Sequence, residues 1–564
     1  MNETPWPETT IFLGAGATAK LGLPSTAESG KVFSILGKID GLPSSGTLRK
    51  RISDTGCFKG VEDELCDLLC WLGDDLNSEL GEFSAQEEAA LARQFPDLDE
   101  KERRAQAIFL REQYDWRCLK RVIQVCPGNH DQYDSFQNNL LNLLDLHIQA
   151  NKGFIVSSKE SGENLKDSFI PAYRLRFARQ MMLLLSIIMY MTAWKQAVQN
   201  KPNLKPYIQF FDILAELMGE EGRRFSKKFK TNDRNFYLFS CAFISTNYDP
   251  GLMWLLMNSH EKANRKPPRV GDPPVPMKLF LDFECMTSGR HGKNTSIWHS
   301  VNESVTQRLN DPEHQCDRRF RIGKFYLPHG CFAWRDCPNC GHVTSFQPGK
   351  WSPYSPDIYP PTIIKGINPE LSAFATKKEK EAYKAGQYDA VQCSYCGQMT
   401  YMRDTPLILQ TSFKGAHPFY IEGIQTDMRV CLENTRHIVL LGYSLPPDDI
   451  IYKSMLAARK NRGKSIYCSV VVGHKGEKRW ISGSELKEYL QKYKHFNSYG
   501  GPTIEIAVGI FGEENVRAFT GGIPAVFGEP VQRQKILELL YPTDVGVECF
   551  FDGGVKRGKT GSSV

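Results

Sequence analysis

The chain lacks the sequence features of a secreted or membrane protein. Its first residues contain no basic segment followed by a hydrophobic one, so no signal peptide is expected. The longest apolar run, residues 181–194, is interrupted by Ser186 and Thr192 and is too short to span a bilayer, so it predicts a buried core helix. Without an export signal, we expect a cytoplasmic protein whose 16 cysteines form one metal site and reduced core thiols.

The chain also lacks a strong excess of charge, and no internal repeat is visible in it. Its formal net charge is +6 over 564 residues, which is too mild to predict a nucleic-acid partner. The basic run at residues 223–234 is typical of a solvated surface, so direct nucleic-acid binding is not expected. The composition, with 41% hydrophobic and 24% charged residues, is typical of a globular protein of several domains.

Four apolar runs of strand length end abruptly in glycine or in polar residues. They lead into Gly14-Ala15-Gly16-Ala17, Thr246-Asn247-Tyr248-Asp249, Leu327-Pro328-His329-Gly330 and Gly442-Tyr443-Ser444-Leu445. An α/β protein delivers functional side chains in this way, from the carboxyl ends of buried strands. Each also has a structural explanation, because glycine suits a tight strand–helix turn, asparagine and aspartate are common in turns, and a histidine can be a satisfied interior residue.

The pattern elsewhere predicts alternating helices and strands around a long helical segment. Strands are predicted at 324–327, 407–410, 437–441 and 465–472, and helices at 252–258, 450–460, 484–493 and 531–540. The stretch after 493, through residue 527, is predicted to be β-rich or irregular. From about 41 to 235 apolar residues recur at helical spacing, which predicts a helical insertion inside an α/β core.

Two Cys-x-x-Cys-Gly sequences form the sharpest local signal in the chain. They are Cys337-Pro338-Asn339-Cys340-Gly341 and Cys393-Ser394-Tyr395-Cys396-Gly397. The two-residue spacing turns both thiolates towards one ion, and glycine permits the backbone turn behind them. The four cysteines therefore predict a closed, structural zinc site, and a redox pair is the weaker alternative. The 52 residues between Cys340 and Cys393 indicate a loop or small subdomain inserted in this module, with His342 as a bystander.

Taken in order, these features resemble the sirtuin family in its broad sense, which includes bacterial sirtuin-like proteins. The resemblance implies an α/β fold with a Rossmann-like, mostly parallel sheet, a four-cysteine zinc-ribbon module and a large helical insertion. It places the NAD-binding core at 1–40 and 236–475, with the zinc module at about 331–406 and the helical insertion at 41–235. An α+β extension at 476–552 and a disordered tail at 553–564 would follow.

The resemblance also implies the roles of individual residues. Asn247 would hold the nicotinamide ribose and a water molecule, Asp249 would orient its strand end and the carboxamide, and His329 would act as a base on a ribose hydroxyl. Asparagine and histidine suit these tasks because both can donate and accept hydrogen bonds. The expected NAD⁺ contacts come from Gly14, Ala15, Gly16, Ala17, Thr18, Thr246, Gly442, Tyr443 and Ser444.

Two departures from the deacylating sirtuins bear on which molecule accepts the ADP-ribosyl group after nicotinamide has left. The glycine turn continues into Gly22-Leu23-Pro24-Ser25-Thr26-Ala27, without the family's arginine. After the zinc module, where the family has Phe-Gly-Glu, the strand at 407–410 runs into Thr411-Ser412-Phe413-Lys414, and the Phe-Gly-Glu triplets at 511–513 and 527–529 lie too far along the chain to fill that place. These losses favour water as the acceptor, as in bacterial sirtuin-like NAD⁺ hydrolases of anti-phage defence. Such proteins assemble with themselves or with a partner such as a HerA-like ATPase or an Argonaute-like protein. The alternatives are an NAD-dependent deacylase or ADP-ribosyltransferase, and a non-catalytic module that senses an NAD-derived nucleotide.

The two cysteine pairs lead to a first prediction. Because a closed thiolate site contributes folding free energy, Cys393→Ser should lower solubility or melting temperature as well as activity. Metal analysis of the parent protein should return one zinc per chain. A value well below one would contradict the four-cysteine assignment.

Overall fold

The computed structural model describes a large part of the chain, and all structural statements concern that part. The described residues are 9–37, 45–54, 98–105, 114–128, 133–158, 166–225, 238–266, 277–283, 287–290, 296–297, 319–336, 340–347, 351–356, 358–359, 391–392, 399–400, 407, 419–446, 449–458, 466–473 and 477–542, with single positions between 58 and 92. Cys337, Cys393 and Cys396 lie outside them.

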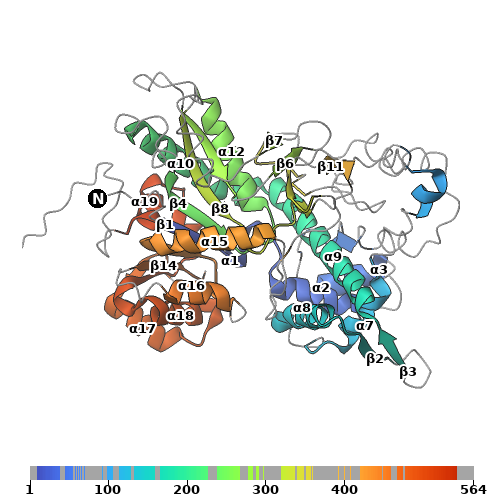
Figure 1. Cartoon of the computed structure of the whole chain (residues 1–564). Coiled ribbons are helices and arrows are strands. Elements are labelled where there is room, and N and C mark those ends of the chain that lie inside the picture. Colours follow the sequence, from blue (N-terminus) through green and yellow to red (C-terminus); the bar gives the residue numbers. More distant parts are fainter. Residues whose placement is uncertain are drawn as a thin grey trace, which may run out of the picture.

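An eight-stranded sheet forms the centre of the fold (Figure 1). Its strands, in spatial order, are β15 (Trp480–Ser482), β16 (Val516–Phe519), β14 (Tyr467–Val471), β13 (His437–Leu441), β1 (Thr9–Leu13), β4 (Leu238–Ser245), β8 (Arg319–Tyr326) and β5 (Met277–Asp282). Every neighbouring pair is parallel except β15 with β16. All residues of β1 and β13 are buried, as expected for central strands covered on both faces. The prediction of an α/β fold with a mostly parallel, Rossmann-like sheet is thus confirmed.

Helices from both halves of the chain surround the sheet. They are α10 (Lys201–Phe225), α12 (Gly251–Arg265), α15 (Phe419–Asn434), α16 (Ile450–Ala458), α17 (Gly483–Tyr493), α18 (Gly501–Phe511) and α19 (Arg533–Leu540). In Figure 1, α10 and α12 lie beside β8, whereas α16, α17 and α18 lie beyond β14. The stretch expected to be a C-terminal extension supplies β15 and β16 to this same sheet.

Helix α18 contradicts the prediction of a β-rich or irregular stretch after residue 493. Its sequence is rich in isoleucine, valine and threonine, which favour strands, and it carries an internal glycine. Packing overrides these preferences, because Thr503, Ile504, Ala507 and Phe511 recur at helical spacing and are all buried. Pro502 in the first turn helps the helix to begin there.

The described part of the predicted insertion is mainly helical. It contains α3 (Ser45–Asp54), α7 (Trp116–Val125), α8 (Tyr133–Gln149) and α9 (Ala172–Gln199), and α2 (Thr26–Gly37) packs against α7 and α8. An antiparallel hairpin of β2 (Phe154–Ser158) and β3 (Lys166–Ile170) interrupts the helices and was not predicted. The apolar run at 181–194 lies in α9, which among the described residues is the one helix long and apolar enough to cross a membrane. Its apolar window is 89% buried inside the protein, as expected for a core helix.

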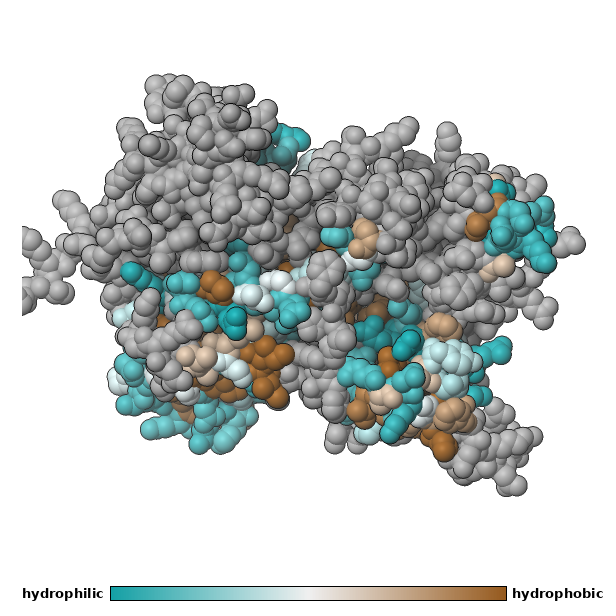
Figure 2. All heavy atoms as spheres, viewed as in Figure 1, coloured by the Kyte–Doolittle hydropathy of each residue, from teal (hydrophilic) through white to brown (hydrophobic). Residues whose placement is uncertain are grey.

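The coloured residues in Figure 2 include both hydrophilic and hydrophobic ones. Hydrophobic residues gather over the lobe that contains α16 and α18, and again near α7, α8 and the β2–β3 hairpin. Exposed large side chains include Ile450 on α16, and Ile155 and Phe169 on the hairpin. Ile155 and Phe169 are directly paired across β2 and β3.

Both cysteine pairs are flanked by short antiparallel strands. Residues 337–342 separate β9 (Trp334–Asp336) from β10 (Val343–Gln347), which pair with each other, and residues 393–398 separate the paired strands β11 (Val391–Gln392) and β12 (Met399–Thr400). Strand β10 also pairs with β6 (Thr287–Arg290), against which β11 lies. Within the described residues no cluster of three potential metal ligands is found. Of the predicted strand at 407–410, only Leu407 is described, and it bridges to Gly330.

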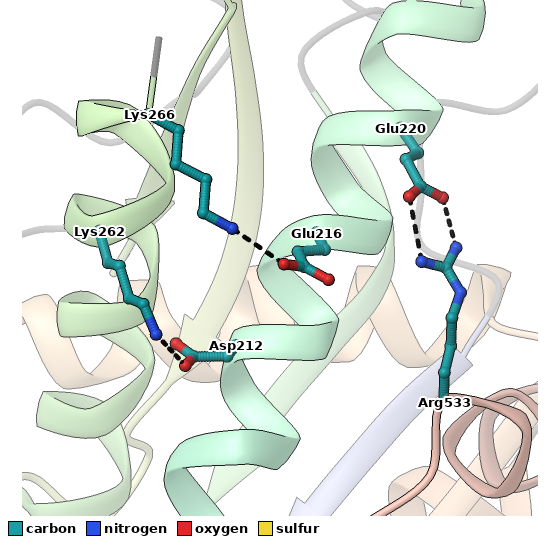
Figure 3. Close-up of polar contacts among 6 residues, drawn as sticks. All are labelled: Asp212, Glu216, Glu220, Lys262, Lys266 and Arg533. Atoms are coloured by element: carbon teal, nitrogen blue, oxygen red, sulfur yellow. Dashed lines mark hydrogen bonds and ion pairs between the residues drawn. The ribbon is translucent and has the colours of Figure 1, made fainter. Parts of the chain in front are cut away.

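Ion pairs on the surface hold α10 between two neighbouring helices (Figure 3). Asp212, Glu216 and Glu220 recur every four residues along α10. The first two pair with Lys262 of α12 and with Lys266, which directly follows that helix, and the third pairs on the other side with Arg533 of α19. Exposed pairs of this kind each contribute less than about 1 kcal/mol, so they orient α10 more than they stabilise it.

A buried ion pair joins the sheet to α15. The ammonium of Lys324 on β8 is 1% exposed and lies 2.7 Å from Asp282 of β5 and 2.9 Å from Asp427 of α15. The hydroxyl of Tyr326 donates a 2.7 Å hydrogen bond to the same oxygen of Asp427. A charge removed from water in this way is stable only while its partners remain in place.

This contrast between buried and exposed lysines can be measured. Lys324→Met leaves the buried Asp282 and the partly buried Asp427 without their cation and should lower the free energy of unfolding by about 3–5 kcal/mol. Lys262→Met removes an exposed pair and should cost less than about 1 kcal/mol. Denaturant unfolding of both variants tests this, and equal costs would contradict the structural role assigned to Lys324.

Candidate active site

The four sequence motifs meet at one edge of the sheet. Strands β13, β1, β4 and β8 are consecutive neighbours and run in parallel, so their carboxyl ends lie side by side. Leu13 at the end of β1 is paired with Leu441 on one side and Ser245 on the other, and Ile244 is paired with Tyr326 of β8. Asn247 and His329 therefore follow neighbouring strands of the sheet.

The glycine turn after β1 packs tightly against the end of β13. The amides of Gly14 and Gly16 donate to the carbonyl oxygens of Leu441 and Gly442, at 3.3 and 3.0 Å. Gly442 has a φ of +63°, and a Cβ atom there would lie 2.1 Å from the nitrogen of Ala17. A Cβ on Gly14 would lie 2.5 Å from the carbonyl oxygen of Gly442. Close backbone packing therefore explains these glycines without any ligand.

This packing limits what the turn can offer to a phosphate. The amide of Ala17 donates to the carbonyl of Gly14, and the hydroxyl of Thr18 donates to that of Ala15, so both groups already have partners. Ala15 and Gly16 are exposed, whereas Ala17 and Thr18 are buried. A pyrophosphate at this turn would thus meet the Ala15 backbone first, and the amides of Gly14, Gly16 and Ala17 only if they exchanged their present partners.

The adenosine contacts expected after β13 fall into two groups. The ring of Tyr443 stacks on Phe12, with centroids 5.4 Å apart, and its hydroxyl donates a 2.7 Å hydrogen bond to Asp449. Tyr443 is therefore a packed, hydrogen-bonded part of the site wall. Ser444 is exposed, and its carbonyl oxygen accepts a 3.5 Å hydrogen bond from the hydroxyl of Thr503 of α18.

Asn247 and Thr246 connect the end of β4 to the turn after β1. The side-chain amide of Asn247 donates to the carbonyl oxygen of Gly14 at 3.1 Å, and its backbone amide donates to the hydroxyl of Ser245. The backbone amide of Thr246 donates to the carbonyl of Leu13 at 3.0 Å. Asn247 is 8% exposed, so its side chain is held in one orientation next to the glycine turn.

The imidazole of His329 is completely buried between two tyrosines. Its Nδ1 atom lies 3.2 Å from the carbonyl oxygen of Thr246, which can only accept, so Nδ1 carries the proton in the neutral ring. The Nε2 atom makes no hydrogen bond with the residues that the structure describes but lies 3.4 Å from Oδ1 of Asp449. The rings of Tyr452 and Tyr248 lie 5.3 and 6.0 Å away. A proton taken up at Nε2 would therefore be stabilised by the Asp449 carboxylate.

Asp249 lies at the start of α12 with one oxygen unused. Its Oδ1 atom accepts a 3.0 Å hydrogen bond from the amide of Gly251, whereas Oδ2 has no partner among the described residues. Burial raises the pKa of this carboxyl from 3.8 to about 6, and the backbone hydrogen bonds only partly offset that effect. An ionised carboxylate at neutral pH is thus held in a position that disfavours its charge.

Sequence reasoning missed Asp449 and Tyr452. Asp449 is completely buried and reaches His329 from the segment after β13. In the sequence it stands just before a predicted helix, where an aspartate is typical of a helix cap. The only signal for another role was its closeness in sequence to the end of β13.

The strained carboxylate predicts an unusual dependence of stability on pH. Because the pKa of Asp249 is about 6 in the folded chain and near 3.8 when unfolded, the folded state binds the proton more tightly, and stability falls as pH rises from about 4 to 6. Asp249→Asn removes this loss and should raise the free energy of unfolding by roughly 1–3 kcal/mol at pH 8, with little change at pH 4.

Asp212→Asn is the matched control, since that carboxylate is paired near the surface of α10 and should give no gain. The test is to measure the free energy of unfolding of the parent and both variants at pH 4 and pH 8. A less stable Asp249→Asn protein at pH 8 would contradict the assignment of strain to this carboxylate.

Comparisons with known proteins do not assign the chain to a family. No family model matches it, and no curated protein matches it significantly. The functional conclusion therefore depends on the geometry at the carboxyl edge of the sheet and on the sequence resemblance described above.

Proposed function

We propose that this protein hydrolyses NAD⁺ at the bond between nicotinamide and ribose, giving nicotinamide and ADP-ribose. One observation carries the proposal: the ends of β4 and β8 hold a buried amide, carboxylate and imidazole at one edge of a parallel sheet. Two of their polar atoms, Oδ2 of Asp249 and Nε2 of His329, make no hydrogen bond with the described residues. Buried polar atoms without partners are costly, and they are commonly retained where a ligand satisfies them.

The chemistry of these groups suits the reaction. Departure of nicotinamide leaves positive charge on the ribose, which a nearby carboxylate stabilises most effectively where water is excluded. His329 can accept a proton at Nε2 from a ribose hydroxyl or from the attacking water, and Asp449 would stabilise the imidazolium. Asn247, fixed to the glycine turn, would orient the ribose and the water.

We propose that a structural zinc ion is held by Cys337, Cys340, Cys393 and Cys396. Two observations on the flanking residues support it. Each pair lies between antiparallel strands, and the two hairpins are neighbours through β6. Gly341 has a φ of +71° with open space around its Cα, so only backbone conformation requires glycine there. Nδ1 of His342 lies 3.2 Å from the carbonyl oxygen of Cys340, which agrees with a bystander role.

The biological setting remains a proposal that follows from the resemblance. It is a cytoplasmic role in anti-phage defence, in which the chain assembles with itself or with a HerA-like ATPase or Argonaute-like partner. Water as the acceptor is supported by the absence of the family's arginine after the glycine turn and of Phe-Gly-Glu directly after the zinc module.

Two substitutions test the catalytic roles. Asn247→Ala and His329→Ala should each lower the rate of nicotinamide release by about a hundred- to ten-thousand-fold, because each removes a positioned polar or acid–base group. Asn203→Ala and His147→Ala are the matched controls, since Asn203 is exposed on α10 and His147 on α8 lies against Phe154 of β2. Release must be measured where the parent is active, including any activating partner.

The possible outcomes distinguish the NAD⁺ hydrolase from the alternative functions. A folded, zinc-loaded variant that works within a few-fold of the parent removes that residue from the mechanism. Turnover that depends on an added acyl-lysine peptide or protein acceptor would identify a deacylase or ADP-ribosyltransferase. Binding of NAD⁺ by the parent with no turnover under any condition would identify a nucleotide sensor.

A further inference from the structure

Helix α9 contacts the segments that carry the candidate site residues. It begins just after the β2–β3 hairpin and runs towards the sheet (Figure 1). The ring centroid of Tyr190 on α9 lies 5.3 Å from that of Phe332, which follows His329 in the chain. A Cβ on Gly251, at the start of α12, would lie 2.7 Å from the Trp194 ring of α9. This helix of the insertion therefore lies against the segments that follow both β8 and β4.

Arg179 on the same helix makes hydrogen bonds to two different segments. Its Nε atom donates a 2.9 Å hydrogen bond to Oδ1 of Asp145 on α8, and its Nη2 atom donates a 3.3 Å hydrogen bond to the carbonyl oxygen of Leu407. Both partners are buried. Because the planar guanidinium holds its donors in a fixed fork, this one side chain joins α8, α9 and the segment that follows the second cysteine pair.

Leu407 continues this connection to His329. Its backbone forms an antiparallel bridge with Gly330, the residue after His329. Gly330 has a φ of +79°, and its amide donates a 2.9 Å hydrogen bond to the carbonyl oxygen of Leu327, so His329 lies within a tight turn. The imidazole itself is held through Nδ1 by the carbonyl oxygen of Thr246. The position of His329 thus depends on the end of β4 and on the backbone of Leu407.

A second arginine of α9 makes the same kind of ion pair without this connection. Arg174 donates through Nε to Asp115 at 2.7 Å, and Asp115 caps the start of α7 by accepting a hydrogen bond from the amide of Cys118. Both arginines therefore join α9 to another helix of the insertion through partly buried ion pairs. Of the two, only Arg179 also donates to the backbone of Leu407. The bond to Leu407 is thus not needed to pair α9 with its neighbouring helices.

We propose that Arg179 is a positioning residue for His329 and acts through the backbone of Leu407. This inference rests on the proposed function, and it makes catalysis depend on how α8 and α9 pack against the segment that follows the zinc module. Asn247 and the glycine turn, which would bind NAD⁺, are fixed by other contacts. Loss of the hydrogen bond to Leu407 should therefore slow the reaction and spare NAD⁺ binding.

Arg179→Lys tests the proposal. A lysine keeps the positive charge beside Asp145 but has a single ammonium in place of the fork, so the hydrogen bond to Leu407 should be lost. We expect kcat to fall about ten- to a hundred-fold, because small displacements of an acid–base group are costly, and KM for NAD⁺ to stay within about three-fold. Arg174→Lys is the matched control and should change neither value by more than about two-fold. Both variants should fold, since each keeps its ion pair.

Hydrogen exchange of the peptide 327–336 separates this inference from the proposed hydrolysis, because it needs no substrate. Its amides should exchange at least about three-fold faster in Arg179→Lys than in the parent and Arg174→Lys proteins. That result and a lower kcat in Arg179→Lys alone support the proposal. The same exchange result with a parent that never releases nicotinamide supports the connection to the His329 turn and rejects hydrolysis.

Three results would overturn the role of Arg179. Unchanged exchange in Arg179→Lys removes the connection itself, whether or not the parent cleaves NAD⁺. Faster exchange with unchanged kcat removes the positioning role and leaves hydrolysis intact. Equal effects of Arg179→Lys and Arg174→Lys on exchange and on kcat would indicate a general loosening of α9 instead of a contact to the His329 turn.

Discussion

The contact between two backbone turns at the centre of the sheet is the constraint on which the site depends. Gly14 and Gly442 approach so closely that a methyl group on either would overlap the other turn. This approach sets the spacing between the ends of β1 and β13, and the side-chain amide of Asn247 then ties the end of β4 to the same turn. Three neighbouring strand ends are thereby fixed, and His329 joins them through the carbonyl of Thr246.

One buried group next to these strand ends, the carboxylate of Asp249, destabilises the folded state at neutral pH. Asp249 is ionised at neutral pH although its surroundings favour the protonated form, and its Oδ2 atom has no partner among the described residues. Elsewhere, the buried Lys324 has carboxylates on two sides, so burial of charge in this chain is ordinarily compensated. Asp249, by contrast, lies at the edge of the sheet where a substrate would bind. An unpartnered polar group there can bind a ligand.

The sequence was most informative where apolar runs ended in distinctive residues. The strand ends before Gly14, Thr246, His329 and Gly442 could be predicted because both faces of a central parallel strand are buried, which leaves a continuous apolar run. Helix α18 could not be predicted, because its β-branched residues are helical only through packing in the finished fold. Asp449 was missed for a related reason. In the sequence it resembles a helix cap, and only the folded chain brings it to His329.

The position of β1 has a consequence for how the site comes into being. This strand lies between β13 and β4, so Thr9 is paired with His437 on one side and Cys241 on the other. Closing such long loops is entropically costly, and contacts between distant residues form late in folding. During synthesis, more than four hundred residues are therefore added after β1 before its second neighbour, β13, exists. The strand ends that would bind and cleave a dinucleotide are separate until then, so a growing chain would remain inactive until β13 has been made, although β14, β15 and β16 are still to follow.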